Sequence, residues 1–212
     1  ASRALYAVID LESDLALADS GIGHARLYLE RFPDTPDAKA VRLLVGKFYA
    51  DTGKTAEAIA AYEEYEKRYP GDARMREVYY LIGRSYQSGG DTKASTDYFS
   101  RVTNVPGGED LYYAARQQIA QNFVAEKEPL EAALAMDEVL SNYRQKPLPI
   151  ETSLWVARSF AEAKRYDDAI RVLDAAASHA DAPTNAAALA YYRAEALAGL
   201  SRHDEALAAR CH

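Results

Sequence analysis

The chain has 212 residues, of which 49% are hydrophobic and 27% are charged, and this ordinary balance argues against a disordered protein. Its net charge of −7 argues against a general nucleic-acid binder, because the phosphate backbone attracts basic surfaces. The single cysteine, Cys211, excludes an intrachain disulfide and a thiolate metal cluster, and no apolar run approaches the roughly 20 residues of a membrane helix.

Residues 1–37 predict a degenerate helical hairpin. A poorly patterned first helix lies near residues 5–9, and residues 20–23, Ser-Gly-Ile-Gly, predict a turn or a frayed helix start. The second helix is expected over residues 24–31. Such an atypical unit is typical of the end of a repeat array.

Residues 38–72 and 73–109 contain the two best-patterned hairpins. Small and large apolar side chains follow one helical stripe on each arm, so neither arm can bury its stripe alone. We expect the first hairpin to turn near Gly53 and the second at residues 88–91, because glycine readily ends a helix. Residues 104–108, Asn-Val-Pro-Gly-Gly, form the longest break and the best candidate for a bend.

Three further units follow, over residues 110–146, 147–183 and 184–212. The turns of the first two, at residues 126–129 and 163–167, lack glycine. The last unit stops inside what should be its second helix, so it is a truncated repeat. Because a solenoid does not naturally end on an unfinished hairpin, we expect the chain to be a piece of a longer protein.

One motif occurs five times at a spacing of 37 residues. It consists of a small residue, a large apolar residue three positions later and a second small residue twelve positions later. The first small residues are Gly46, Gly83, Ala120, Ala157 and Ala194. The large residues are Tyr49, Tyr86, Phe123, Phe160 and Leu197, and the second small residues are Ala58, Ser95, Ala132, Ala169 and Ala206. A fixed period of this length indicates a repeat array, in which the small residue lets a second helix approach and the aromatic fills the gap beside it.

These residues resemble the tetratricopeptide repeat. The segments Val45-Gly46-x2-Tyr49 and Ala58-x3-Tyr62 match its pattern, and Arg42 stands where that pattern has tryptophan. The motif recurs in phase over nearly the whole chain, with a period three residues longer than the usual period of about 34. The resemblance implies an all-α, right-handed superhelical solenoid of antiparallel helix hairpins, formed as a single domain by residues 1–212.

The 37-residue spacing is similar to that of bacterial envelope proteins with these repeats, such as the outer-membrane barrel-assembly lipoprotein and the Tol–Pal-associated periplasmic coordinator. The join at residues 32–38, Phe-Pro-Asp-Thr-Pro-Asp-Ala, is also similar. This resemblance implies a periplasmic or outer-membrane-associated protein, although residues 1–5 are not a signal peptide.

The resemblance also implies that the first helix of each hairpin lines a concave groove. Two sets of residues would then face a bound protein or peptide. They are Lys47, Arg84, Gln121, Arg158 and Glu195, and, one turn earlier, Leu43, Tyr80, Gln117, Leu154 and Tyr191. The cations at Lys47, Arg84 and Arg158 would meet acidic groups of the partner beside tyrosine anchors, since Tyr and Arg are enriched at binding hot spots. The alternative is that these long side chains are merely hydrated.

No catalytic, metal or cofactor site is predicted. The four histidines, His24, His179, His203 and His212, are scattered without the spacing of a metal site, and no nucleophile or phosphate-loop motif occurs. The carboxylate pair at residues 167–168 suits a helix start, and the pair at residues 63–64 suits a hydrated outer wall.

The sequence therefore predicts a non-catalytic scaffold that binds a protein or peptide partner, with no cofactor, no nucleic acid and no transmembrane segment. Two alternatives stay open. The chain could be a regulatory or targeting domain of a larger enzyme, or a module that self-associates through its open C-terminal repeat.

Overall fold

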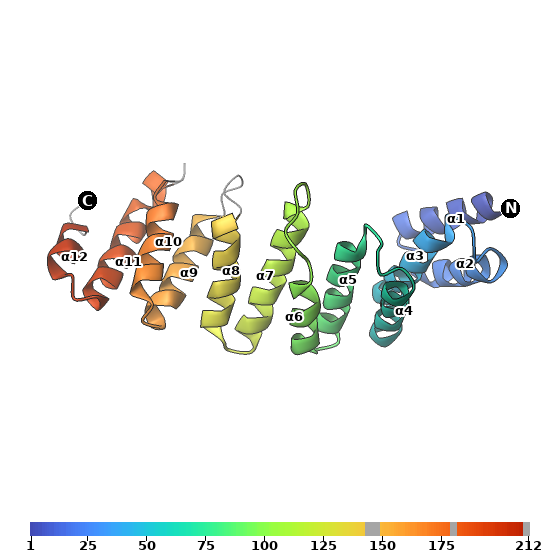
Figure 1. Cartoon of the computed structure of the whole chain (residues 1–212), viewed down its shortest axis with the longest axis horizontal. Helices are drawn as coiled ribbons and strands as arrows, with labels where there is room; N and C mark the ends of the chain where they lie inside the picture. Colours follow the sequence, from blue (N-terminus) through green and yellow to red (C-terminus); the bar gives the residue numbers. More distant parts are fainter. Residues whose placement is uncertain (143–148, 179–181, 210–212) are drawn as a thin grey trace. The chain divides into compact units, whose positions relative to one another are not determined.

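The computed structural model describes residues 1–142, 149–178 and 182–209. All regular structure in these ranges is helical (Figure 1). The predicted boundary between the units 110–146 and 147–183 lies outside the described residues, as do His179, Cys211 and His212.

The chain divides into two compact units, Ala1–Val105 and Pro106–His212. The division falls within residues 104–108, the segment that the sequence identifies as the longest break in the pattern. Each unit is an array of helical hairpins, and the arrangement of residues 1–212 as one continuous solenoid stays a prediction.

The first unit consists of three hairpins (Figure 1). Its helices are α1 (Ser2–Asp14), α2 (Ala18–Arg31), α3 (Ala38–Asp51), α4 (Thr55–Arg68), α5 (Met75–Ser88) and α6 (Thr92–Ser100). Each helix packs against the next one in the chain, and α1 also contacts α3. One helix pair lies in each of the three predicted repeats of this unit.

The second unit repeats this plan within its described residues. Its elements are α7 (Glu109–Ala125), α8 (Pro129–Asn142), α9 (Ile150–Glu162), α10 (Tyr166–Ala176), the 3₁₀ turn η1 (Ala182–Asn185), α11 (Ala186–Gly199) and α12 (His203–Ala209). Consecutive α-helices pack together, and α11 contacts α9 as well as α10. The helices α9 and α11 are the first helices of successive hairpins, and they form the walls of the cleft described below.

The small residues of the repeat are buried, and a side chain of the paired helix fills the space that they leave. A Cβ atom added to Gly83 would lie 2.8 Å from the ring of Phe99, which is fully buried. Gly46 lies under the ring of Tyr62 in the same way. The filling aromatic therefore comes from the second helix of the hairpin, whereas the sequence pattern assigned that place to the residue three positions after the glycine.

The first hairpin differs most from the prediction. Residues 20–23 lie inside α2 and do not form a turn, because Gly21 is buried against the ring of Phe48 on α3. The position equivalent to Gly46, 37 residues earlier, is Ile9, and the position equivalent to Tyr62 is Ala25. Both are fully buried. In this hairpin the large side chain therefore lies on the first helix and the small one on the second, the reverse of the later hairpins, and the core between the two helices is still filled.

The same turn closes all six hairpins of the described residues, with or without glycine. Gly53 ends α3 with a φ of 71°, as predicted, and the amide of Lys54 donates to the carbonyl of Tyr49 at 2.9 Å. At equivalent positions, Lys164 has a φ of 61° and Ser201 a φ of 60°. Packing of the flanking helices therefore imposes the left-handed conformation even where the residue disfavours it.

The carboxylates at residues 63–64 do not form a hydrated wall as predicted. Glu63 accepts hydrogen bonds from the hydroxyls of Tyr86 at 2.9 Å and Tyr98 at 3.3 Å, so it joins α4 to α5 and α6. Only Glu64 is largely exposed, with 67% of its side chain accessible. The other predicted pair, Asp167 and Asp168, lies in the first turn of α10 and is confirmed as a helix-start pair.

Candidate functional site

In the first unit, the predicted groove residues are largely occupied by contacts within the protein. The Nζ atom of Lys47 donates to the carbonyl oxygen of Ser13 at 3.1 Å and to its Oγ at 2.6 Å. Leu43, one turn earlier on α3, is 9% exposed and belongs to the core. The face of α3 that carries both residues therefore lies against α1, and Lys47 satisfies the carbonyl group of Ser13 near the end of that helix.

The two groove residues on α5 are more accessible. Tyr80 is half-buried, with its ring centroid 5.4 Å from that of Phe99. Arg84 is exposed and forms no ion pair or hydrogen bond with the described residues. This helix thus presents a cation to solvent, whereas α3 does not.

In the second unit, the groove positions on α7 and α9 differ in exposure. Gln117 donates from Nε2 to the hydroxyl of Tyr113 at 2.9 Å, and Gln121 is exposed. Leu154 is half-buried. The remaining three groove residues, Arg158, Tyr191 and Glu195, are all exposed, and they line one cleft.

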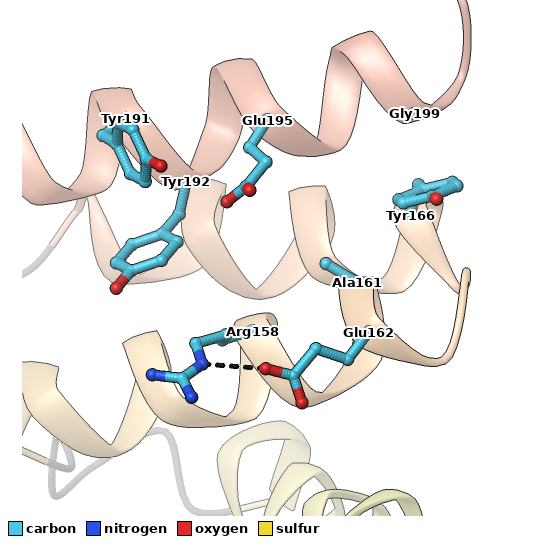
Figure 2. Close-up of a pocket in the computed structure, with 8 residues that line it drawn as sticks. All are labelled: Arg158, Ala161, Glu162, Tyr166, Tyr191, Tyr192, Glu195 and Gly199. Carbon is cyan, nitrogen blue, oxygen red and sulfur yellow. Dashed lines mark hydrogen bonds and ion pairs between the residues drawn. The ribbon is translucent and has the colours of Figure 1, made fainter.

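This cleft lies between α9 and α11 and has a volume of about 410 Å³. Its lining residues are Arg158, Ala161, Glu162, Tyr166, Tyr191, Tyr192, Glu195 and Gly199. Figure 2 shows Tyr191 and Tyr192 toward one end, Tyr166 and Gly199 toward the other, and the charged side chains between them. We call it the α9–α11 cleft. Its volume is in the range of sites that bind a small ligand or a large side chain, which begins at roughly 300 Å³.

The repeat explains why these side chains reach the cleft. Ala157 and Ala194 are buried, with 1% and 0% of their surface exposed. Arg158 and Glu195 are the next residues on their helices, and the rotation from one residue to the next points their side chains away from the core. At the far end, Gly199 has no side chain, and a Cβ atom there would overlap the ring of Tyr166. The sequence pattern missed Tyr166, Tyr192 and Glu162, since their approach depends on how two hairpins pack.

Some of the charged side chains of the α9–α11 cleft have a counter-ion within the described residues, and one does not. Arg158 donates from Nε to Oε1 of Glu162 at 2.9 Å, and this hydrogen bond, helped by Tyr192, raises the pKa of Arg158 above its ordinary value. Glu195 has no ion pair or hydrogen bond among the described residues. The cleft therefore holds one neutralised pair and one carboxylate without a counter-ion.

A second, much smaller cavity occurs in the first unit, with a volume of about 40 Å³. It is lined by Leu29, Arg42, Val45, Ala61, Glu64 and Tyr65. Arg42, at the position where the repeat pattern has tryptophan, reaches Glu64 at 3.8 Å between Nη1 and Oε1. The cavity is well below the size of a ligand site.

Within the described residues, no cluster of His, Cys, Asp or Glu side chains is arranged to bind a metal ion. His24, for example, bonds through Nδ1 to the buried carboxylate of Glu12 at 2.9 Å. The same residues include no helix that is both long and apolar enough to span a membrane.

The stacked hairpins and the cleft on their first helices define a helical-repeat protein, and comparison with known families identifies the repeat. Residues 15–73 and 77–105 match family models described as tetratricopeptide repeat. Both matches lie in the first unit, whose hairpins are therefore similar to tetratricopeptide repeats, and such repeats generally mediate protein–protein interactions. No curated protein sequence matches the chain significantly.

Solved structures with this fold cover the whole array. A repeat-containing protein from Cytophaga hutchinsonii is 18% identical, with a TM-score of 0.65 over 99% of this chain and 82% of its own. A tetratricopeptide repeat protein from Parabacteroides merdae is 15% identical, with a TM-score of 0.61 over 98% and 77%. MamA is 18% identical, with a TM-score of 0.57 over 93% and 97%. At these identities the likeness concerns the fold, and it confirms the all-α solenoid of antiparallel helix hairpins.

Proposed function

We propose that this chain is a non-catalytic protein–protein interaction scaffold that holds an extended peptide or a partner helix in the α9–α11 cleft. The observation that carries the proposal is the convergence of Arg158, Tyr191 and Glu195 on that cleft. The resemblance to the tetratricopeptide repeat implies the concave binding face for the same three residues. Tyr191 supports the proposal further, because a large aromatic side chain that is 53% exposed beside a cleft is the type of residue that anchors partners.

We propose further that the scaffold serves a bacterial envelope assembly, at the periplasmic face or at the outer membrane. The support is the repeat period of 37 residues, which is similar to that of envelope proteins with these repeats.

Affinity capture tests the scaffold function. The tagged chain and its Arg158→Ala/Tyr191→Ala variant are used to capture partners from cells that express the protein, and the recovered proteins are quantified by mass spectrometry. We expect the double variant to lose a specific partner by roughly tenfold or more, because truncated hot-spot residues commonly cost at least about 2 kcal/mol of binding. Glu151→Gln, an exposed change on α9 that does not line the cleft, is the matched control.

A second double variant, Tyr80→Ala/Arg84→Glu, examines the exposed residues of α5 in the same assay. If only this variant loses the partner, the binding surface lies in the first unit and not in the α9–α11 cleft. Recovery of the same partners at the same level from the wild type and both double variants would contradict binding by either surface.

A second candidate function, self-association, is favoured by a separate observation on α1. Val8 and Leu11 lie on one face of this helix, and Leu15 caps its C-terminal end; they are 42%, 56% and 59% exposed. Leu11 is equivalent to Phe48, whose ring packs on Gly21 of the preceding hairpin. The exposed face of α1 is therefore a repeat-stacking face, and we propose that an apolar helix, from a preceding repeat or from a second copy of the chain, covers it.

A further inference from the structure

We infer that the α9–α11 cleft recognises a cationic side chain, lysine or arginine, on the bound peptide. The inference rests on the proposed peptide-binding function and gives the chemistry of the partner. It reverses the expectation from the sequence, in which Arg158 would meet an acidic group.

The first argument is the charge that the cleft leaves unpaired. Glu162 and Glu195 contribute two carboxylates and Arg158 contributes one guanidinium, which the 2.9 Å bond to Glu162 already occupies. Arg193, the neighbouring cation on α11, is bound to Asp174 at 2.7 Å. The Glu195 carboxylate thus lacks a counter-ion among the described residues, and an incoming cation would supply one.

The second argument comes from a combination that the protein forms repeatedly within its own fold. Arg101 lies over the ring of Tyr98, 4.3 Å from its centroid, and is paired with Asp97 at 2.7 Å. Likewise, Arg116 lies 5.1 Å from the ring centroid of Tyr112. It is paired with Glu138 at 3.0 Å. In each case one cation is held by a tyrosine face and a carboxylate together, an arrangement that uses cation–π and ionic attraction at once.

Tyr191 and Glu195 form the same combination without its cation. They are four residues apart on α11, so their side chains lie on one face of the helix, and both are exposed. The Tyr191 ring lies edge-on to that of Tyr192, with centroids 5.2 Å apart at an interplanar angle of 79°, which limits the positions that it can adopt. Figure 2 shows Glu195 directed into the space between α11 and α9, toward the Arg158–Glu162 pair.

The shape of the cleft suits a side chain presented by an extended peptide. The tyrosines of α11 lie toward one end of the lining and Tyr166 toward the other (Figure 2). A backbone running along this direction would place one long side chain beside Glu195. Lysine and arginine fit because their aliphatic stems pack on aromatic rings while the charged group reaches the carboxylate.

Titration of the full chain with defined peptides tests the inference. The probes are three capped alanine peptides that differ only at the central residue, which is Arg, Gln or Glu. Binding is followed by ¹⁵N–¹H NMR shifts of the amides of α9 and α11. We expect the Arg peptide to shift residues around Glu195 at lower concentration than the Gln peptide, and the Glu peptide to shift them least.

The variants separate a specific contact from general attraction to an acidic protein. Glu195→Gln removes the charge with little change in size and should weaken binding of the Arg peptide by roughly three- to tenfold. Glu151→Gln removes an equal charge from α9 outside the cleft and should leave binding unchanged.

Three outcomes overturn the inference. They are equal or tighter binding of the Gln or Glu peptide in the cleft, equal weakening by Glu195→Gln and Glu151→Gln, and no shift with any peptide. Tight binding of the Glu peptide would leave the scaffold function standing with an acidic partner. The scaffold function itself fails only if the capture experiment finds no dependence on Arg158 and Tyr191 or on Tyr80 and Arg84.

Discussion

At the scale of single residues, the packing of the hairpins depends on glycines at positions where two helices come close together. Gly46 and Gly83 lie in the middle of α3 and α5, although glycine costs a helix about 1 kcal/mol relative to alanine. The cost is offset because Tyr62 and Phe99 occupy the space over them and are almost completely buried. The glycine is therefore a packing residue rather than a point of flexibility.

This view predicts opposite effects for two glycine-to-alanine changes. Gly83→Ala should lower the free energy of unfolding by up to about 2 kcal/mol, because overpacking costs about 1–3 kcal/mol and improved helix propensity returns about 1. Gly23→Ala should raise it by about 1 kcal/mol, since Gly23 is exposed within α2 and a methyl group there would meet open space. Urea denaturation followed by circular dichroism measures both, and stabilisation by Gly83→Ala would contradict the packing role.

At the scale of helices, hydrogen bonds between polar side chains join helices that also pack through apolar contacts. Glu63 of α4 accepts hydrogen bonds from Tyr86 of α5 and Tyr98 of α6. The hydrogen bond to Glu63, burial and the negative charge raise the pKa of Tyr86 to about 12. Burial, followed by the charge of Glu63, also raises the pKa of Tyr98. The protonated hydroxyls are the donors, so the folded state holds these protons more tightly than the unfolded chain.

The stability of the first unit should therefore fall at high pH. The contribution of Tyr86 is fully present below its ordinary pKa of 10.0 and is lost as the pH rises toward about 12. In Glu63→Gln the pKa of Tyr86 should move back toward 10.0, and the decline in stability over this window should become shallower. Ring-carbon NMR of the labelled tyrosines follows the titration, with Tyr86→Phe to assign the signal. An unchanged Tyr86 titration in Glu63→Gln would exclude the carboxylate as the cause.

At the scale of the whole molecule, each hairpin depends on its neighbours to cover its apolar faces. The equivalents of Leu11 in the later first helices are buried: Phe48, Ser85, Asn122, Ser159 and Ala196. Leu11 itself is 56% exposed beside Val8 and Leu15. Contiguous exposed apolar side chains of this kind mark interaction surfaces.

Self-association through α1 is one way to cover this face, and we state it as a prediction. Light scattering over a range of concentrations should show a mass that rises above that of one chain, and Leu11→Glu should hold the mass at one chain, because it buries a charge in the contact. Val124→Glu, which places the same charge at a 53% exposed apolar residue of α7, should leave the association unchanged. A wild-type mass of one chain at every concentration would show that this prediction is wrong.

The repeat and the hairpins could be predicted from the sequence because they depend on local spacing. A small residue, a large residue and a second small residue recur every 37 positions, and helical geometry alone puts them on the buried stripe. The resemblance to the tetratricopeptide repeat selected Arg158, Tyr191 and Glu195, which stand at fixed positions relative to the buried Ala157 and Ala194. The turns without glycine, such as the one at Lys164, were also placed correctly by the period.

Only the tertiary structure decided which side chains remain free to bind. Lys47 is bound to Ser13, Glu63 to two tyrosines and Arg158 to Glu162, whereas Glu195 stays unpaired among the described residues. Most of these partners lie on other helices, and the choice between a solvent-facing charge and an internal hydrogen bond depends on distances of a few tenths of an ångström. Spacing along the chain determines the direction in which a side chain points from its helix. Packing between helices determines whether that side chain already bonds to another residue of the protein.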